Sequence, residues 1–299
     1  MHVVEHLARM GGVSGRARLV QVSSRRAVDG ALRRGQIVRD SHGRYALPSA
    51  LAAFRVAGSM SAVVSLRSAA TFWGWEQKKV PDRPDVTVPR NRKVSAEDQR
   101  RACVHWVDLA RADIRDGIVT TRVRTLADCM TSLPFDEGLA IADSALRHDD
   151  TTAEELVLLA KGLRGPGSAQ ARRGARLATG RAANPFESVL RAIALSVTGV
   201  DFDAQASIDL PSGTVSPDLT DRRLGIVVEA DSFAWHGDRR ALRRDCRRYK
   251  RLVLAGWLVL RFSWEDVILR PVYVRECLVA ARDLASRRAQ RRSAPREAA

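Results

Sequence analysis

The sequence contains few cysteines and no long apolar run. Its four cysteines, at positions 103, 129, 246 and 277, lie too far apart for zinc-finger spacing, and their pattern does not resemble a disulfide framework. No stretch approaches about 18 uninterrupted apolar residues, and the first residues lack a cationic segment followed by an apolar core. We therefore expect a cytoplasmic protein that is neither secreted nor inserted in a membrane.

Lysine and several enzyme motifs are also scarce or missing. Only five of the 50 basic residues are lysines, at positions 78, 79, 93, 161 and 250, so 45 are arginines. This skew is compatible with a GC-rich coding bias and with selection for the two-pronged contacts that arginine makes with phosphate. No Gly-rich nucleotide-binding loop, GKS/T motif or catalytic triad is visible, so energy-driven translocation would require another subunit.

Positive charge is what the sequence has in excess. Its formal net charge is +16 and its pI is about 11. This is more than solubility requires, so the natural partner is a polyanion. We favour nucleic acid over a membrane surface, and binding to DNA would make the protein nucleoid-associated. With 299 residues and a hydrophobic content of 45%, the chain is long enough for two or three packed domains.

Residues 1–58 have the pattern of a winged helix-turn-helix domain. Three short helices are predicted, over residues 3–10, over residues 15–20, and from Ser23 or Ser24 to Gly35. The segment QIVRDSHGRYALP then has the composition of two short strands around a turn at residues 41–43.

The same segment resembles the N-terminal domain of AbiEi-type antitoxins in its Gly-Gly-Val turn, its SRRAVDGALRRGQIVR helix and its GRYALP ending. Such domains bind promoter DNA in their own operons. The resemblance therefore implies that the third helix enters a major groove with Arg25 and Arg26, and that the protein could have a toxin as partner. The alternative is that Arg25, Arg26, Arg33 and Arg34 only solvate a helix face.

Residues 59–160 are predicted to form an α/β connecting domain without catalytic chemistry. A helix is expected in VVSLRSAATFWGWE, with Leu66, Ala69, Ala70 and Phe72 facing inward. RPDVTVPRN and ACVHWVDL have the composition of strands, and two helices with a break at Pro134 are expected after them.

Two further segments, residues 161–183 and 286–299, lack the large apolar side chains of a core. The first is rich in Gly, Ala and Arg and is predicted to be a linker that could contain one helix from Ser168 to Thr179. Its arginines either touch a phosphate backbone without specificity or face solvent. The second is predicted to be a basic tail that frays into solvent.

Residues 184–285 form the most informative part of the chain. Asn184 as N-cap and Pro185 as first helical residue open a predicted helix, which places Glu187 in its first turn. Glu187 either pairs with Arg191 one turn later or points toward a metal site.

A hairpin dense in carboxylates follows this helix. FDAQASIDL, TVSPDLT and RLGIVVEA have the pattern of consecutive strands. Side chains alternate along a strand, so Glu229 and Asp231 share one face and can converge on a cation. Asp218, on the preceding strand, neighbours this pair if the hairpin carries a modest stagger or a bulge. Because burying a carboxylate is costly, the tolerated arrangements are a metal, an arginine partner or a wet strand end.

Several separated motifs in this region resemble one family. NPFES, Gln205, SPDL, VEADSFAWHGD, the helix with Asp245 and Arg248, and GWLVLRFSWEDV are similar to the Vsr-like domains of the PD-(D/E)XK nuclease superfamily, which include the very-short-patch repair endonucleases. The resemblance implies a restriction-endonuclease-like mixed sheet flanked by helices. The whole chain is therefore expected to be a multidomain α/β protein.

The resemblance also implies an active site. Asp218 and Asp231 would be the principal metal ligands, with Glu229 beside them. Glu187 would be an accessory acid, and His236 a proton-transfer group or a phosphate contact. The implied cofactor is Mg²⁺, with Mn²⁺ as a substitute, since oxygen ligands suit such hard cations. A bound water activated as hydroxide would attack phosphorus, and the cation would stabilise the leaving oxygen.

Two positions depart from the family pattern. The usual E-x-K lysine is absent because Asp231 holds its position, and His236 could substitute as general acid or base. Ser232 stands where relatives usually carry glycine, and serine is less free than glycine to adopt a positive φ.

A basic segment follows the acids. Residues 238–251 contain eight basic residues against two acidic ones. In a helix, five arginines would align along one stripe that could follow a phosphate backbone: Arg240, Arg243, Arg244, Arg247 and Arg251. The alternative is an ordinary solvated helix face.

The preferred hypothesis is a winged-helix DNA reader joined to a Mg²⁺-dependent endonuclease domain that hydrolyses DNA phosphodiester bonds. The alternative is an antitoxin-type transcriptional regulator whose nuclease-like domain is a non-catalytic scaffold that binds DNA or protein. A nickase acting on mismatched or branched DNA is a third interpretation of the same residues.

Overall fold

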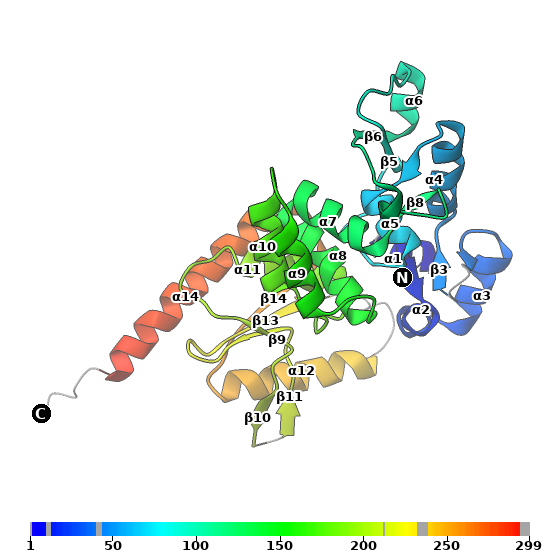
Figure 1. Ribbon diagram of the computed structural model, residues 1–299. Coiled ribbons are helices and arrows are strands. Elements are labelled where there is room, and N and C mark those ends of the chain that lie inside the picture. The colour runs from blue at the N-terminus through cyan, green and yellow to red at the C-terminus, as the bar shows by residue number, and fades with distance from the viewer. Residues whose placement is uncertain (1, 10–12, 40–43, 212, 232–238, 294–299) are drawn as a thin grey trace, which may run out of the picture. The chain divides into compact units, whose positions relative to one another are not determined.

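The structure is a computed structural model that describes residues 2–9, 13–39, 44–211, 213–231 and 239–293. It has the predicted mixed α/β composition and consists of two compact units, Met1–Pro185 and Phe186–Ala299 (Figure 1). Their boundary lies next to residue 184, where the sequence predicts that the nuclease-like domain begins. No helix in the described ranges combines the length and the apolar character needed to cross a bilayer.

The beginning of the first unit has the element order of a winged helix-turn-helix. Its elements are α1 (Val3–Arg9), β1 (Val13–Gly15), α2 (Arg16–Val22), α3 (Arg25–Arg33), β2 (Val38–Arg39) and β3 (Arg44–Ala46). The three strands form an antiparallel sheet in the order β1-β3-β2. The sequence does not predict β1, because three residues are too few to show a strand period. The predicted turn at residues 41–43 lies outside the described residues.

Helix α3 is amphipathic and is capped at one of the predicted starting positions. Ser24 caps it, since the Ser24 hydroxyl accepts a hydrogen bond from the Ala27 amide at 3.1 Å. Val28 and Ala31 are buried, whereas the arginines at positions 25, 26, 33 and 34 are exposed. The chain leaves the helix through Gly35, whose φ of +66° favours glycine. Helix α3 therefore presents a basic outer face.

The rest of the first unit surrounds a larger core. Its elements are α4 (Pro48–Ser59), β4 (Val63–Val64), α5 (Leu66–Phe72), β5 (Asp85–Val88), α6 (Ala96–Arg101), β6 (Cys103–Trp106), η1 (Arg111–Asp113), β7 (Ile114–Arg115), β8 (Val119–Thr120), α7 (Arg122–Ser132), α8 (Phe135–Arg147), α9 (Ala153–Gly162) and α10 (Ser168–Leu177). The five-stranded sheet has the order β6-β5-β4-β8-β7. The predicted strands, the inward residues of α5 and the helix break at Pro134 are confirmed.

The second unit contains a mixed sheet flanked by helices, as the sequence predicts. Its elements are α11 (Pro185–Ala194), β9 (Asp203–Ala204), β10 (Ile208–Leu210), β11 (Gly213–Val215), β12 (Leu219–Asp221), β13 (Ile226–Asp231), α12 (Arg239–Leu254), β14 (Leu258–Ser263), α13 (Trp264–Leu269) and α14 (Pro271–Ser293). The sheet has the order β14-β13-β12-β9, with β13 and β14 parallel and the other pairs antiparallel. Strands β10 and β11 form a separate hairpin.

Strand β13 is buried on both faces along its first half. Ile226 and Val228 share a core with Val189 of α11, and Val227 shares another with Leu252 of α12. This two-sided burial explains the continuous apolar run at the start of the strand. The carboxylates follow where this run ends.

Helix α14 is longer than the sequence suggests. It continues to Ser293, so much of the predicted basic tail, residues 286–299, is helical rather than frayed. Arginine, alanine and glutamine are good helix formers, and no proline or glycine interrupts them here. Residues 294–299 lie outside the described part of the chain.

The predicted linker at residues 161–183 is wrong, because most of this segment is folded. Helix α10 packs against α7, α8 and α9, and Ala171 and Ala175 are buried in the core of the first unit. These small side chains let helices approach closely, although in the sequence they look too small to form a core.

Polar contacts also fix α10 in place. The Gln170 side-chain amide donates hydrogen bonds to the Met130 and Leu133 carbonyl oxygens at 3.0 and 2.9 Å. Gly167, just before the helix, has a φ of +76° and approaches Thr131 so closely that an added Cβ would lie 2.0 Å from the Thr131 carbonyl oxygen.

Replacing Gly167 tests this docking. Gly167→Ala should lower the free energy of unfolding by at least about 1 kcal/mol, since the left-handed backbone alone costs an L-residue that much and the new carbon collides with Thr131. Gly162→Ala is the matched control, because an added Cβ there meets nothing within 4 Å. Chemical denaturation measures both variants. If Gly167→Ala were as stable as Gly162→Ala and wild type, residues 161–183 would behave as a linker and not as part of the core.

Candidate active site at the end of strand β13

The last residues of β13 carry two of the predicted site residues. Glu229 is only 3% exposed, and the Asp231 side chain is 29% exposed. Their positions two residues apart put them on one face of the strand, as the sequence predicts. In the parallel pairing with β14, Glu229 lies opposite Arg261 and Asp231 opposite Ser263.

Asp218 joins these acids without a stagger or a bulge. The register pairs Leu219, the first residue of β12, with Val228. This places Asp218, one residue before β12 begins, beside Glu229. The Asp218 Oδ2 atom accepts a hydrogen bond from the Ala230 amide at 2.7 Å. The regular register therefore brings Asp218 to the end of β13.

Gln205 connects Asp218 to the helix α11. Its Nε2 atom donates to Glu187 Oε2 at 3.1 Å and to Asp218 Oδ1 at 3.0 Å, and its backbone amide donates to the Asp218 carbonyl oxygen at 3.0 Å. Since both side-chain partners are carboxylates, the NH₂ end of the amide must face them. The contact favours the interpretation in which Glu187 points toward the acidic site.

The role of Gln205 is not evident from the sequence. Its backbone has a φ of +52°, a left-handed conformation that is uncommon outside glycine. Because its backbone adopts this uncommon conformation and its side-chain amide binds both Glu187 and Asp218, we assign Gln205 to the site. The sequence identifies it only as a position in the motif that resembles the Vsr-like domains.

Two arginines contact the acids of β13. Arg248 Nη2, from α12, lies 3.2 Å from Glu229 Oε2, and Arg261 Nη2, from β14, lies 2.5 Å from Asp231 Oδ2. Tyr249 supports both cations: its hydroxyl accepts a hydrogen bond from Arg248 at 3.1 Å, and its ring centroid lies 3.9 Å from the Arg261 guanidinium carbon. The sequence pattern allows for an arginine partner but does not identify these two.

Burial controls the ionisation of the site. The pKa of Glu229 is raised from 4.5 to about 8, because burial and the neighbouring Asp218 disfavour the charged carboxylate more than Arg248 favours it. Burial also raises the pKa of Asp218, against the Ala230 amide and the charge of Arg248. Glu229 Oε1 is buried and has no hydrogen-bond partner in the described part of the chain. One buried carboxylate oxygen of the site is therefore not satisfied by the arginines and amides around it.

The acids offer the oxygen donors that Mg²⁺ and Mn²⁺ prefer, and the unsatisfied Glu229 oxygen is a further donor. However, no group of three or more His, Cys, Asp or Glu side chains among the residues described has an arrangement that could hold a metal ion. The donor chemistry therefore fits a hard cation, whereas the geometry is that of acids paired with arginine.

Other predicted site residues are described in part or not at all. His236 and Ser232 lie outside the described residues. The predicted basic helix is present as α12, but the side chains of Arg240, Arg243 and Arg244 are not among those described. Arg247 is exposed, and Arg251 Nη2 donates to the Gly213 carbonyl oxygen at 2.9 Å.

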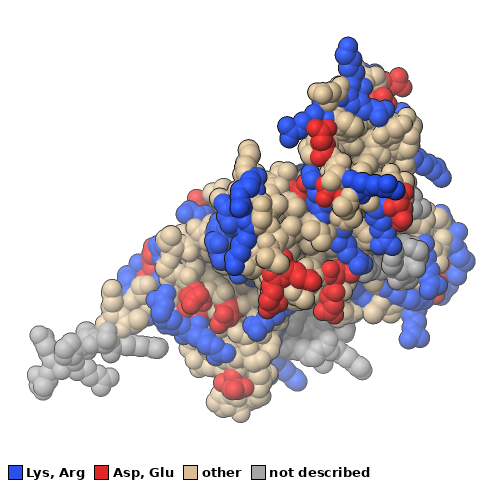
Figure 2. Space-filling model, viewed as in Figure 1, with Lys and Arg blue, Asp and Glu red and all other residues tan. Residues whose placement is uncertain are grey.

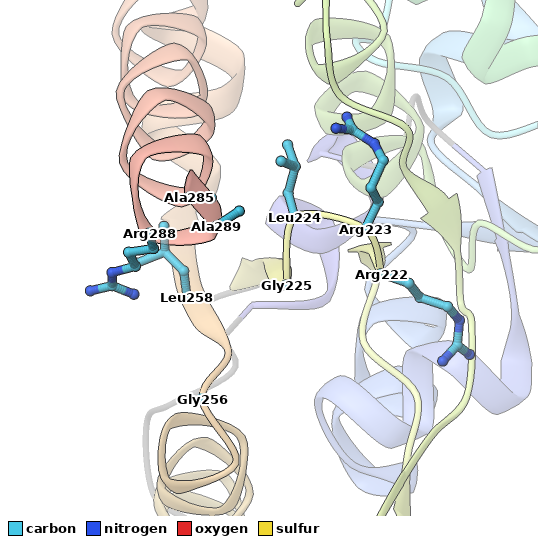
Figure 3. Close-up of a pocket in the computed structure, with 9 residues that line it drawn as sticks. All are labelled: Arg222, Arg223, Leu224, Gly225, Gly256, Leu258, Ala285, Arg288 and Ala289. Atoms are coloured by element: carbon cyan, nitrogen blue, oxygen red, sulfur yellow. The ribbon is translucent and has the colours of Figure 1, made fainter. Parts of the chain in front are cut away.

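A cavity of about 470 Å³ lies at the opposite end of β13 and β14 (Figure 3). Leu224, Leu258 and Ala285 contribute apolar walls, and Arg222, Arg223 and Arg288 also line it. Figure 3 shows that the three guanidinium groups point in different directions. Two of them are engaged by carbonyl oxygens, Arg222 with Ser207 and Arg223 with Gly199. The cavity therefore lacks convergent polar groups.

Comparisons with known proteins add little. No family model and no curated protein matches the sequence. Among solved structures, the chain is similar to the RV2827C protein from Mycobacterium tuberculosis, with 17% sequence identity and a TM-score of 0.31 over 70% of this chain and 88% of that chain. A likeness at this level supports no conclusion about fold or function. The resemblances to AbiEi-type antitoxins and to Vsr-like nucleases therefore stay predictions.

The raised pKa of Glu229 predicts a pH-dependent stability. In the folded protein this carboxyl keeps its proton up to about pH 8, whereas in the unfolded chain it loses it near 4.5. The unfolded state therefore binds fewer protons between these values, and stability falls as the pH rises through them. Glutamine resembles the protonated form of Glu229, so Glu229→Gln should remove this loss of stability. Relative to wild type, the melting temperature of Glu229→Gln should therefore rise steadily from about pH 5 to about pH 8.

Thermal unfolding in the presence of EDTA measures this difference. Glu276→Gln is the control, because Glu276 is exposed on α14 in the same unit. It should follow the wild-type curve at every pH. A Glu229→Gln curve parallel to that of wild type would show that Glu229 ionises normally.

Proposed function

We propose that the second unit is a DNA endonuclease that uses Mg²⁺, or Mn²⁺ in its place, and that the winged helix at the start of the chain reads DNA. The observation that carries the proposal is the gathering of Glu187, Asp218, Glu229 and Asp231 from the helix α11 and two strands at one end of the sheet. Carboxylates gathered beside arginines are the elements that metal-dependent phosphodiester hydrolysis requires.

In this proposal Asp218 and Asp231 hold the cation, with Glu229 beside them and Glu187 as accessory acid. The cation supplies activation of a water molecule and stabilisation of the leaving oxygen. Binding a divalent cation would also favour the ionised form of Glu229 and so remove the effect of its burial. His236 is proposed as the proton-transfer group.

The arginines of the site have a second task in this proposal. Arg248 and Arg261 hold the acids in place before the cation binds. With a divalent cation bound by Glu229 and Asp231, these guanidinium groups would be positioned to contact a phosphate. Arg261 suits this task, because it is 34% exposed and its guanidinium lies over the Tyr249 ring.

Cleavage of supercoiled plasmid DNA tests the proposal. The wild-type protein should nick or linearise the plasmid with Mg²⁺ or Mn²⁺ and not with EDTA. Asp218→Asn and Asp231→Ala should each reduce the rate by about two orders of magnitude or more, the scale seen when a group that stabilises developing charge is removed. Asp209→Asn is the control, since Asp209 is exposed on the β10-β11 hairpin. An inactive wild type, or an active Asp231→Ala, would contradict the proposal.

A second candidate function is an antitoxin-type transcriptional regulator whose second unit is a non-catalytic scaffold. One observation favours it: the acids of β13 are already paired with arginines, and the residues described include no metal-holding group of three. DNA would then be bound by α3, and a toxin would be the protein partner. Specific DNA binding without plasmid cleavage in any metal is the result that this candidate predicts.

A further inference from the structure

The segment from α9 to residue 181, which we call the α9–α10 hairpin, has an unusual charge composition. Between Glu155 and Glu187 the sequence contains six basic residues and no acidic one. The six are Lys161, Arg164, Arg172, Arg173, Arg176 and Arg181. Such a run in a mobile linker would hold no defined arrangement, but the docking of α10 gives these residues fixed positions on the first unit.

The hairpin presents these cations to solvent. Lys161, Arg164, Arg173, Arg176 and Arg181 are exposed, and Arg172 is half-buried. Figure 2 shows basic side chains gathered in the region that Figure 1 labels α9 and α10. Helix α10 buries Ala171 and Ala175 on its inner side, and its arginines lie toward the solvent.

Several of these side chains contact neighbouring carbonyl oxygens or an aromatic ring of the same unit. Arg164 Nη1 donates to the Lys161 and Leu163 carbonyl oxygens at 2.7 and 3.1 Å, and Arg172 Nη1 donates to the Leu163 carbonyl oxygen at 3.3 Å. The Arg173 guanidinium carbon lies 4.5 Å from the centroid of the Phe135 ring.

Other arginines of the same unit are paired with acids. Arg67 contacts Asp85 and Glu137, and Arg124 contacts Asp113 and Asp128. By contrast, Lys161, Arg164, Arg176 and Arg181 have no carboxylate partner within the ranges that the structure describes. These four exposed cations of the hairpin are therefore accessible to an external anion.

We propose that the α9–α10 hairpin binds the sugar–phosphate backbone of double-stranded DNA, as a surface distinct from α3 and α12. Arginine suits phosphate because its guanidinium can donate two parallel hydrogen bonds to one phosphate group. A membrane surface would also attract these cations, but an interfacial helix buries a face of large apolar side chains in lipid. The apolar residues of α10 are mainly alanines, and Ala171 and Ala175 are already buried in the protein core.

A charge-matched pair of triple variants tests the proposal. The hairpin variant carries Lys161→Gln, Arg176→Gln and Arg181→Gln. The control variant carries Arg90→Gln, Arg101→Gln and Arg115→Gln, which removes the same net charge from exposed arginines of the same unit that lie beside Asp108, Asp98 and Asp116. Fluorescence anisotropy with a duplex of about 30 base pairs and arbitrary sequence, in EDTA and over a range of salt concentrations, gives the affinity without cleavage.

The hairpin variant should bind the duplex at least about tenfold more weakly at low salt. Its slope of log K against log salt should fall by about 0.9 for each phosphate that the protein no longer neutralises. The control variant should stay close to wild type in both quantities. An equal weakening of both variants, or of neither, would overturn the proposal.

Two further measurements complete the test. Equal melting temperatures for wild type and both variants show that the substitutions leave the fold intact, and a hairpin variant that melts lower is replaced by its three single substitutions. Vesicles containing phosphatidylserine are the alternative partner. If the hairpin variant loses vesicle binding while its DNA affinity is unchanged, the surface is a membrane site and the proposal is wrong. No outcome depends on whether the second unit cuts DNA.

Discussion

A buried carboxyl at the end of an apolar strand determines the organisation of the second unit. Glu229 follows residues that are enclosed on both faces of β13, so it cannot reach solvent, and Asp218 lies next to it. A carboxylate in such a place needs a cation or a proton. The structure supplies Arg248 from α12, but the second carboxylate oxygen of Glu229 has no hydrogen-bond partner in the described part of the chain, and burial raises the pKa of the group to about 8.

The same constraint gives the proposed chemistry its physical basis. Gln205 holds Glu187 and Asp218 on one amide, and Tyr249 holds Arg248 and Arg261. Acids and cations are thereby kept close together although they come from different elements of the fold. Such an arrangement can serve as a metal site that exchanges arginine for a divalent ion, or as a neutral network that stabilises a scaffold. The two proposed functions differ in this one respect.

Much of the fold follows from local sequence signals, whereas the site depends on contacts that the sequence does not encode locally. The Ser24 cap, the break at Pro134 and the alternation of Glu229 and Asp231 are short-range features, and the structure contains each of them. The possible helix from Ser168 to Thr179 is present as α10, but its packing into the core escaped prediction because alanine packing leaves no apolar period in the sequence. Arg261 escaped it because its contact with Asp231 depends on the register of a parallel strand pair whose members are separated by a whole helix.

The most direct test of a cation site at the end of β13 is a titration of the protein with Mn²⁺. The electron paramagnetic resonance signal of the free ion measures how much Mn²⁺ remains unbound. We predict saturable Mn²⁺ binding by the wild-type protein at neutral pH. Gln205→Leu should bind Mn²⁺ more weakly, because it removes the side-chain amide that holds Glu187 and Asp218. Gln290→Leu, an exposed change on α14, should bind as wild type does. Absence of saturable binding by the wild-type protein would contradict the proposed cation site and identify the cluster as a network of acids neutralised by arginine alone.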